Sequence, residues 1–92
     1  MTTVPARKVS TALTSKFDFE VEASHHRIYR LYLDGQLMAR TFTSHGTREL
    51  SDFHIQQMSK QMRLSRQEFL AAIECTLDRE TYYALIRERL RP

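Results

Sequence analysis

Residues 26–43 read HRIYRLYLDGQLMARTFT, and this stretch decides the fold class. His26–Leu33 and Leu37–Thr43 are rich in the aromatic and aliphatic residues that strands favour, and Asp34-Gly35 separates them. Asp-Gly suits a two-residue type I′ turn, because both central residues of that turn take a positive φ. The stretch therefore predicts two antiparallel strands joined as a hairpin.

A helix and a further strand are expected before the hairpin. Pro5 suits the first turn of a helix over about residues 5–16, where apolar residues follow a helical spacing. Phe17, Phe19 and Val21 then alternate with acidic residues, which is the period-two pattern of a half-buried strand. Three strands are therefore expected after one helix.

The remainder of the chain is expected to be helical. Ser51 offers an N-cap for a helix whose apolar residues fall on one stripe. Ser65–Glu68 is a capping box, which predicts a helix over about residues 66–75. Thr76 or Asp78 is expected to cap a last helix, which ends in an arginine-rich segment.

These elements predict an α+β fold made of a helix, a three-stranded antiparallel sheet and a helix, with about two additional C-terminal helices. The chain has 92 residues, so we expect a single domain over residues 1–92, with a core over 1–64 and a helical extension over 65–92. A hydrophobic content of 41% with 27% charged residues is typical of a folded protein.

The cysteine content and the hydropathy pattern favour a cytoplasmic protein. Cys75 is the single cysteine, so an intrachain disulfide is excluded and a reducing compartment fits best. Apolar runs long enough to span a bilayer are absent from the sequence, and residues 1–10 lack the apolar stretch of a signal peptide. We therefore expect no contact with a membrane.

Positive charge is concentrated in the first two-thirds of the chain. The formal net charge is +3, and residues 1–66 carry ten lysines and arginines against six acidic residues. Residues 67–92 carry four basic and five acidic residues. The first two-thirds therefore have a mild preference for a polyanion such as RNA.

The four histidines are the main candidates for chemistry: His25, His26, His45 and His54. A histidine gains or loses a proton near neutral pH, so it is the usual general base. His25 and His26 are adjacent, and side chains of adjacent residues point to opposite faces of an extended strand, so only one of them is a candidate base. The spacing of histidines and cysteine does not match a zinc site, so neither a metal nor another cofactor is expected.

The chain resembles the HicA family of small RNA-cleaving toxins from about Lys8 to Leu64. The resemblance rests on the basic first helix with its aromatic turn, the Ser24-His25-His26 step, the Asp34-Gly35 hairpin and residues 44–50, which lead into a helix. That helix ends in Lys60-Gln61-Met62-Arg63-Leu64-Ser65. Ala23 stands where the family usually has glycine, and the Val-Pro step often found before the family's second histidine is absent.

The resemblance implies a fold similar to the double-stranded-RNA-binding domain, metal-independent endonuclease activity on mRNA, and neutralisation by a HicB-type antitoxin. It also implies that His25 is the catalytic residue, that Ser24 belongs to the same motif, and that His45 takes the place of the second histidine. One well-placed base can activate the 2′-hydroxyl of RNA, provided that cations hold the phosphate. The basic residues expected around His25 to bind nucleic acid are Lys8, Arg27, Arg30, Arg40 and Arg48.

Three other functions stay open from the sequence. A module with the same fold could bind RNA or DNA without cleaving it. Asp52–Glu74 could form a helix-turn-helix, with Arg63 and Arg66 directed at DNA. The C-terminal helices carry apolar residues that suit a protein–protein or inhibitor module, among them Tyr82, Tyr83 and Leu90. The sequence also leaves open a homo-oligomer.

Overall fold

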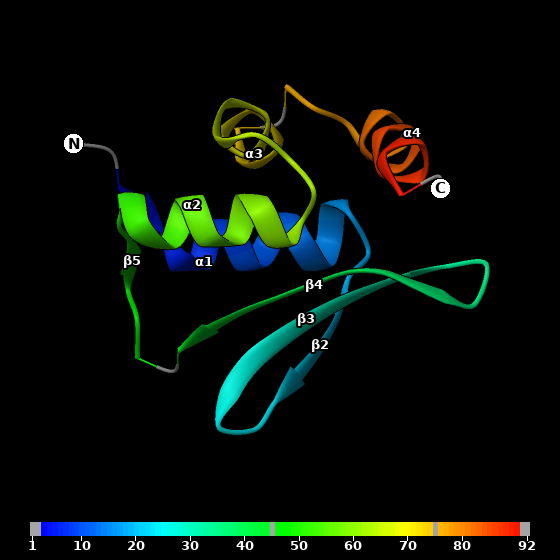
Figure 1. Ribbon diagram of the computed structural model, residues 1–92. Coiled ribbons are helices and arrows are strands. Elements are labelled where there is room, and N and C mark those ends of the chain that lie inside the picture. The colour runs from blue at the N-terminus through cyan, green and yellow to red at the C-terminus, as the bar shows by residue number, and fades with distance from the viewer. Residues whose placement is uncertain (1–2, 45, 75, 91–92) are drawn as a thin grey trace.

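The computed structural model describes residues 3–44, 46–74 and 76–90, and it has an α+β architecture. A three-stranded antiparallel sheet is covered on one face by the helices α1 and α2. α3 lies beyond these two, and α4 lies to one side of them, toward the β3–β4 turn (Figure 1). In chain order the elements are β1 (Val4–Pro5), α1 (Ala6–Thr11), a π-helical continuation η1 (Ala12–Lys16), β2 (Glu20–Ala23), β3 (His26–Leu33), β4 (Gln36–Ser44), β5 (Glu49–Leu50), α2 (Asp52–Gln61), α3 (Arg66–Ile73) and α4 (Arg79–Arg89).

The hairpin predicted over residues 26–43 is confirmed. β3 and β4 pair antiparallel from His26 opposite Ser44 to Leu33 opposite Gln36. Asp34 and Gly35 have φ values of 55° and 77°, as a type I′ turn requires. β2 pairs with the other edge of β3, so the strand order in the sheet is β2-β3-β4.

The strand predicted from Phe17 onward is shorter than the alternating pattern indicates. Phe17 and Phe19 are both buried, but Asp18 between them has a φ of 62°, so the chain turns there and is not extended. The strand begins only at Glu20, and all four of its residues are exposed. The two phenylalanines are therefore buried by a turn that follows the first helix, and the alternation has a different cause from the one expected.

Three helices begin directly after residues that the sequence predicts as N-caps. Ser51 precedes α2, and its backbone N–H donates to Nδ1 of His54 at 3.3 Å, which accounts for that histidine. Ser65 accepts from the backbone N–H of Glu68 at 3.1 Å, so the predicted capping box is confirmed. Asp78, the second of the two expected candidates, caps α4.

The two C-terminal helices share a core with the rest of the chain. Phe69 of α3 and Tyr82 of α4 are fully buried, and the ring of Tyr82 lies 5.1 Å from the ring of Phe17. The hydroxyl of Tyr82 donates to the carbonyl oxygen of Met62 at 3.0 Å. Burial raises the pKa of Tyr82, so its hydroxyl stays protonated and can keep donating this bond.

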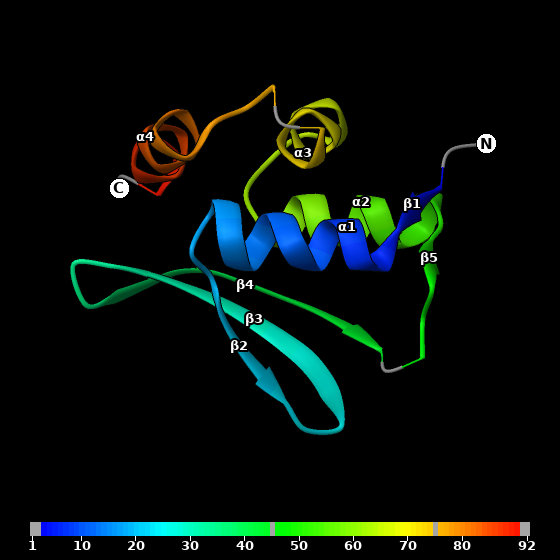
Figure 2. The same ribbon diagram turned by 180° about the vertical axis from the view of Figure 1, so that it is seen from behind.

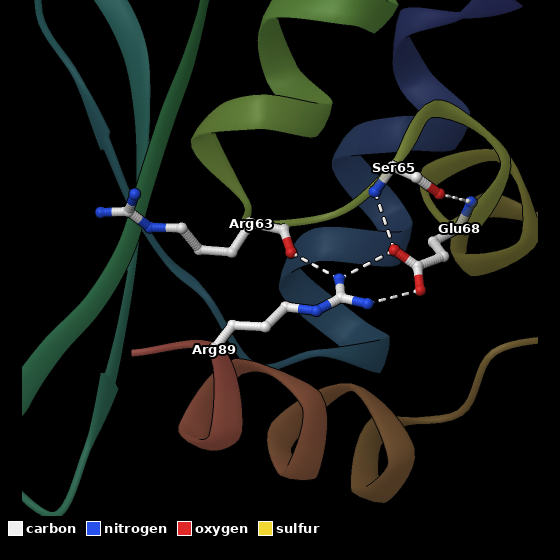
Figure 3. Close-up of polar contacts among 4 residues, drawn as sticks. All are labelled: Arg63, Ser65, Glu68 and Arg89. Atoms are coloured by element: carbon white, nitrogen blue, oxygen red, sulfur yellow. Dashed lines mark hydrogen bonds and ion pairs between the residues drawn. The ribbon is translucent and has the colours of Figure 1, made fainter. Parts of the chain in front are cut away.

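Arg89 joins the end of α4 to the junction between α2 and α3 (Figure 3). Its guanidinium donates to both carboxylate oxygens of Glu68 and, at 2.7 Å, to the carbonyl oxygen of Arg63. Arg63 has a φ of 65°, so the chain reverses direction at this point.

In the described residues, none of the helices has the length and apolarity that crossing a membrane requires.

Candidate nucleic-acid interface

A hollow lined by arginines and hydroxyl groups lies between α1, the start of β3, the end of β4 and the segment 46–48 that follows β4. Its volume is about 550 Å³. Three of its lining residues are arginines, namely Arg7, Arg27 and Arg48. Six carry hydroxyl groups: Ser10, Thr11, Tyr29, Thr43, Ser44 and Thr47. None of the described residues that line it carries a carboxylate, so an anion would meet donors and cations here.

The sheet register places Arg27 in this hollow. Arg27 lies opposite Thr43 and two residues before Tyr29, whose side chain is fully buried. Residues two apart in a strand share a face, so Arg27 belongs to the face that α1 and α2 cover. It therefore extends the buried face of the sheet toward the hollow at one end of β3.

Backbone pairing brings together the segments that carry the other two arginines. Ala6 at the start of α1 donates its N–H to the carbonyl oxygen of Arg48 at 2.8 Å, and Val4 pairs with Leu50 in a short antiparallel ladder. Arg7 follows Ala6 directly, so the same ladder positions it. The hollow is thus assembled from segments that main-chain hydrogen bonds connect.

The three arginines of the hollow differ from five other cations of the described chain in having no acidic partner. Within the described ranges no carboxylate forms an ion pair with Arg7, Arg27 or Arg48. Five other cations have acidic partners, in the pairs Lys8–Glu74, Arg30–Glu22, Arg66–Asp52, Arg87–Asp34 and Arg89–Glu68. The positive charge of the hollow is therefore not neutralised by the ion pairs that neutralise these other cations.

Ser24 and His25 form the turn between β2 and β3. Ala23 pairs with Arg27, so the chain reverses within the three intervening residues, and the N–H of Ser24 donates to the carbonyl oxygen of His26 at 3.0 Å. His25 is exposed. The turn lies at the same end of the sheet as the end of β4 (Figure 2). His25 does not line the hollow, but Arg27, two residues later, does.

The expected opposition of His25 and His26 takes a different form in the structure. His25 precedes β3 and lies in the turn, so the alternation of a strand does not apply to it. His26 begins β3, and its ring lies 5.5 Å from the ring of Phe42 in β4. The side chain of His26 therefore packs against Phe42 on the sheet, which gives it a structural role.

The other predicted nucleic-acid-binding residues are dispersed. Arg30 and Arg40 lie opposite each other on the sheet face that the helices leave uncovered, whereas Arg27 lies on the covered face. Glu22 accepts a hydrogen bond from Arg30 and raises the pKa of that guanidinium, and Arg40 lies 5.7 Å from the ring centroid of Phe42. Lys8 donates to both carboxylate oxygens of Glu74, each at 2.9 Å. His45 lies outside the described residues.

Arg7 is the arginine of the hollow that the sequence did not single out. The signal available was its spacing: Arg7, Ser10 and Thr11 recur at i, i+3 and i+4, which places them on one face of α1. That pattern is common on solvated helices, so it becomes informative only once the position of the 46–48 segment is known.

Ala23 adopts ordinary strand geometry at the position where the HicA pattern has glycine. It ends β2, is exposed, and is not among the residues with a positive φ. The backbone of this turn therefore does not require glycine at position 23.

The residues on which the helix-turn-helix and the protein-binding alternatives depend contact other parts of the chain. Arg66, expected to contact DNA in a helix-turn-helix, forms an ion pair with Asp52. Tyr82 is buried, and Tyr83 is partly buried, with its hydroxyl donating to the carbonyl oxygen of Phe17 at 2.6 Å. Most of the apolar surface that suggested a protein-binding helix is thus used within the chain.

Comparisons of the chain with protein-family models, with curated proteins and with solved structures find no match. Among the residues that the structure describes, no group of three histidine, cysteine, aspartate or glutamate side chains is placed to hold a metal ion.

Proposed function

We propose that the chain is a HicA-like toxin of a toxin–antitoxin pair, a metal-independent endoribonuclease that cleaves mRNA with His25 as general base. The observation that supports this proposal best is the position of His25. It is exposed in the β2–β3 turn, at the same end of the sheet as a hollow with three arginines that lack carboxylate partners among the described residues. A base and a cationic surface at one end of a sheet are the minimum that RNA cleavage requires.

The proposed reaction uses the substrate's own 2′-hydroxyl. The imidazole of His25 takes the proton of this hydroxyl, and the 2′-oxygen forms a bond to the adjacent phosphorus. The bond from phosphorus to the 5′-oxygen of the next nucleotide breaks, and the leaving oxygen takes a proton from water. The hydroxide that remains takes the proton from His25, so the neutral imidazole is restored. The products carry a 2′,3′-cyclic phosphate and a free 5′-hydroxyl, so the atoms balance without a metal or cofactor.

The fold supports an RNA ligand on the helix-covered side of the molecule. The order helix, three strands, helix, with both helices on one face of the sheet, is the arrangement expected for a fold similar to the double-stranded-RNA-binding domain. The hollow opens beside the first of these helices. We propose a cytoplasmic location, which the cysteine content favours, and a HicB-like antitoxin as protein partner, which the resemblance alone supports.

Substitution of His25 tests the catalytic role. A folded His25→Ala protein should cleave single-stranded RNA at least about 100-fold more slowly than the parent, because general-base catalysis contributes about 10²–10⁴-fold. His26→Ala is the matched control, since His26 is the adjacent histidine and contacts Phe42. Both are assayed with EDTA present, and the products are examined for 2′,3′-cyclic phosphate. Undiminished cleavage by His25→Ala would overturn the proposal.

A non-catalytic RNA-binding module is the second candidate. The observation that favours it is that His25, the proposed base, does not line the hollow that carries the arginines. In that case RNA binding depends on salt and survives His25→Ala, and neither protein cleaves RNA.

A further inference from the structure

We infer that the hollow lined by Arg7, Arg27 and Arg48 is a phosphate-binding pocket, and that it holds a phosphate of the RNA chain away from the bond that is cleaved. The identification of RNA as the carrier of the phosphate rests on the proposed function. The pocket itself rests on its charge and geometry, which are independent of catalysis.

The first argument is the unbalanced charge. Three arginines line a hollow of about 550 Å³, and no carboxylate stands among the described residues of its lining. Like charges brought together by folding repel one another, and a bound anion removes that repulsion. Five cations elsewhere in the described chain have acidic partners, so the lack of a carboxylate sets this hollow apart from them.

The second argument is the chemistry of the lining. Guanidinium groups donate paired hydrogen bonds that match phosphate oxygens, and neighbouring hydroxyl groups add single donors. Thr11 of α1 and Thr43 of β4 are among these donors and come from two different elements that line the hollow. A carboxylate ligand would use fewer of these donors than a phosphate, which presents more oxygens.

The third argument is that the hollow is assembled before any ligand arrives. The N–H of Ala6 donates to the carbonyl oxygen of Arg48, and Arg27 is held in register with Thr43. Gly46 has a φ of 84°, and Thr47 donates its N–H to the carbonyl oxygen of Ser44 at 3.4 Å, which forms the turn that leads to Arg48. Cations placed in this way need little rearrangement to bind an anion.

The position of His25 indicates which phosphate the pocket holds. His25 lies in the β2–β3 turn and does not line the hollow, so the phosphate at which it acts is not the one bound there. A volume of about 550 Å³ falls in the range of small-ligand sites and exceeds what a phosphate group alone fills. The pocket therefore suits a phosphate together with part of its nucleotide.

The experiment measures binding of a fluorescently labelled single-stranded RNA octamer by anisotropy, with its 2′-hydroxyls methylated so that the proposed cleavage cannot consume it. The proteins are the parent, Arg7→Ala, Arg48→Ala and, as matched control, Arg87→Ala. Arg87 is an exposed arginine of α4 that pairs with Asp34, at the other end of the sheet from the hollow. All three variants lose one positive charge, so a difference between them reports position and not net charge.

We expect Arg7→Ala and Arg48→Ala to raise the dissociation constant about tenfold and to lower the slope of log Kd against log salt by about 0.7, as the loss of one contact to single-stranded RNA should. Arg87→Ala should bind within about twofold of the parent. Millimolar inorganic phosphate should displace the octamer from the parent and have less effect on Arg48→Ala. Equal weakening by Arg48→Ala and Arg87→Ala would overturn the pocket.

Two further arms separate the sources of the phosphate and the two proposals. Equal affinity for octamers with and without a 5′-phosphate assigns the pocket to an internal phosphodiester, and tighter binding of the phosphorylated octamer assigns it to a terminal phosphate. Loss of binding in the arginine variants without any cleavage by the parent supports the pocket and contradicts the ribonuclease. Cleavage that is lost in His25→Ala but kept in both arginine variants, with unchanged RNA binding by those variants, supports the ribonuclease and contradicts the pocket.

Discussion

Arg89 and Glu68 form a two-bond contact in which the guanidinium of Arg89 donates to both carboxylate oxygens of Glu68, at 2.8 and 2.7 Å. The same carboxylate accepts the backbone N–H of Ser65 at 2.8 Å, so it closes the capping box of α3 while it holds α4. Together these contacts, with that of Arg89 the largest, lower the pKa of Glu68 from its ordinary 4.5 to about 2.

This contact predicts an acid-dependent loss of stability. The folded pKa of Glu68 lies below the unfolded value, so its contribution is fully present above about pH 4.5 and is lost as the pH falls toward 2. Glu68→Gln keeps the capping box but removes the charge. In urea unfolding at pH 5, 4 and 3, the parent should lose about 1–2 kcal/mol more stability than Glu68→Gln, a value reduced for solvent screening. Parallel pH profiles would contradict the assignment.

The hydroxyl of Tyr82 should stabilise the attachment of α4. Tyr82 is fully buried and donates to the carbonyl oxygen of Met62. Tyr82→Phe should cost about 1 kcal/mol for the lost hydrogen bond, and Tyr82→Ala about 3–5 kcal/mol because a cavity forms as well. Tyr32→Phe is the control, since Tyr32 is 43% exposed. Denaturant midpoints measure all three, and equal effects of the two phenylalanine variants would exclude a role for the Tyr82 hydroxyl.

The parts of the fold that follow from local chemistry could be predicted from the sequence. The Asp34-Gly35 turn requires two positive φ values, and few dipeptides supply them as readily. The capping box at Ser65 involves side-chain and backbone groups only three residues apart. These signals depend on neighbours in the sequence, so tertiary packing had little opportunity to override them.

The arrangement of the candidate site could not be predicted in the same way. Arg27 and Arg30 are three residues apart in one strand, so they lie on opposite faces of the sheet. Only the position of the helices decides that Arg27, and not Arg30, lines the hollow. Arg7 approaches Arg48 through pairing of segments more than forty residues apart. Phe17 and Phe19 show a period of two without a strand, because a single positive φ at Asp18 produces the same burial pattern.

The hairpin turn should be sensitive to a side chain at position 35. Gly35 has a φ of 77°, and no atom lies within 4 Å of the place that a Cβ would take, so Gly35→Ala introduces backbone strain and no steric clash. We expect it to lower the free energy of unfolding by about 1–2 kcal/mol. Asp34→Asn is the control: asparagine tolerates the same φ, and the exposed contact with Arg87 at 3.7 Å contributes little. A neutral Gly35→Ala would show that the turn adopts another type in solution.

Glu74 should weaken RNA binding, because its carboxylate pairs with Lys8. Lys8 lies next to Arg7 of the hollow, and both carboxylate oxygens of Glu74 accept from its ammonium group. The pair is exposed, so its loss should change stability by less than about 1 kcal/mol. Glu74→Gln removes the negative charge and frees Lys8, so the affinity for the RNA octamer should rise about two- to fivefold at low salt.

The matched control for this gain is Glu88→Gln, which makes the same change of charge on an exposed residue of α4. It should increase affinity less, because the charge lies away from α1 and long-range effects are screened within about 10 Å at 0.1 M salt. Adding Lys8→Ala to Glu74→Gln should return the affinity to near that of the parent, since the added cation is then gone. If Glu88→Gln and Glu74→Gln increase affinity equally, the effect reports net charge alone, and Lys8 has no specific part in binding.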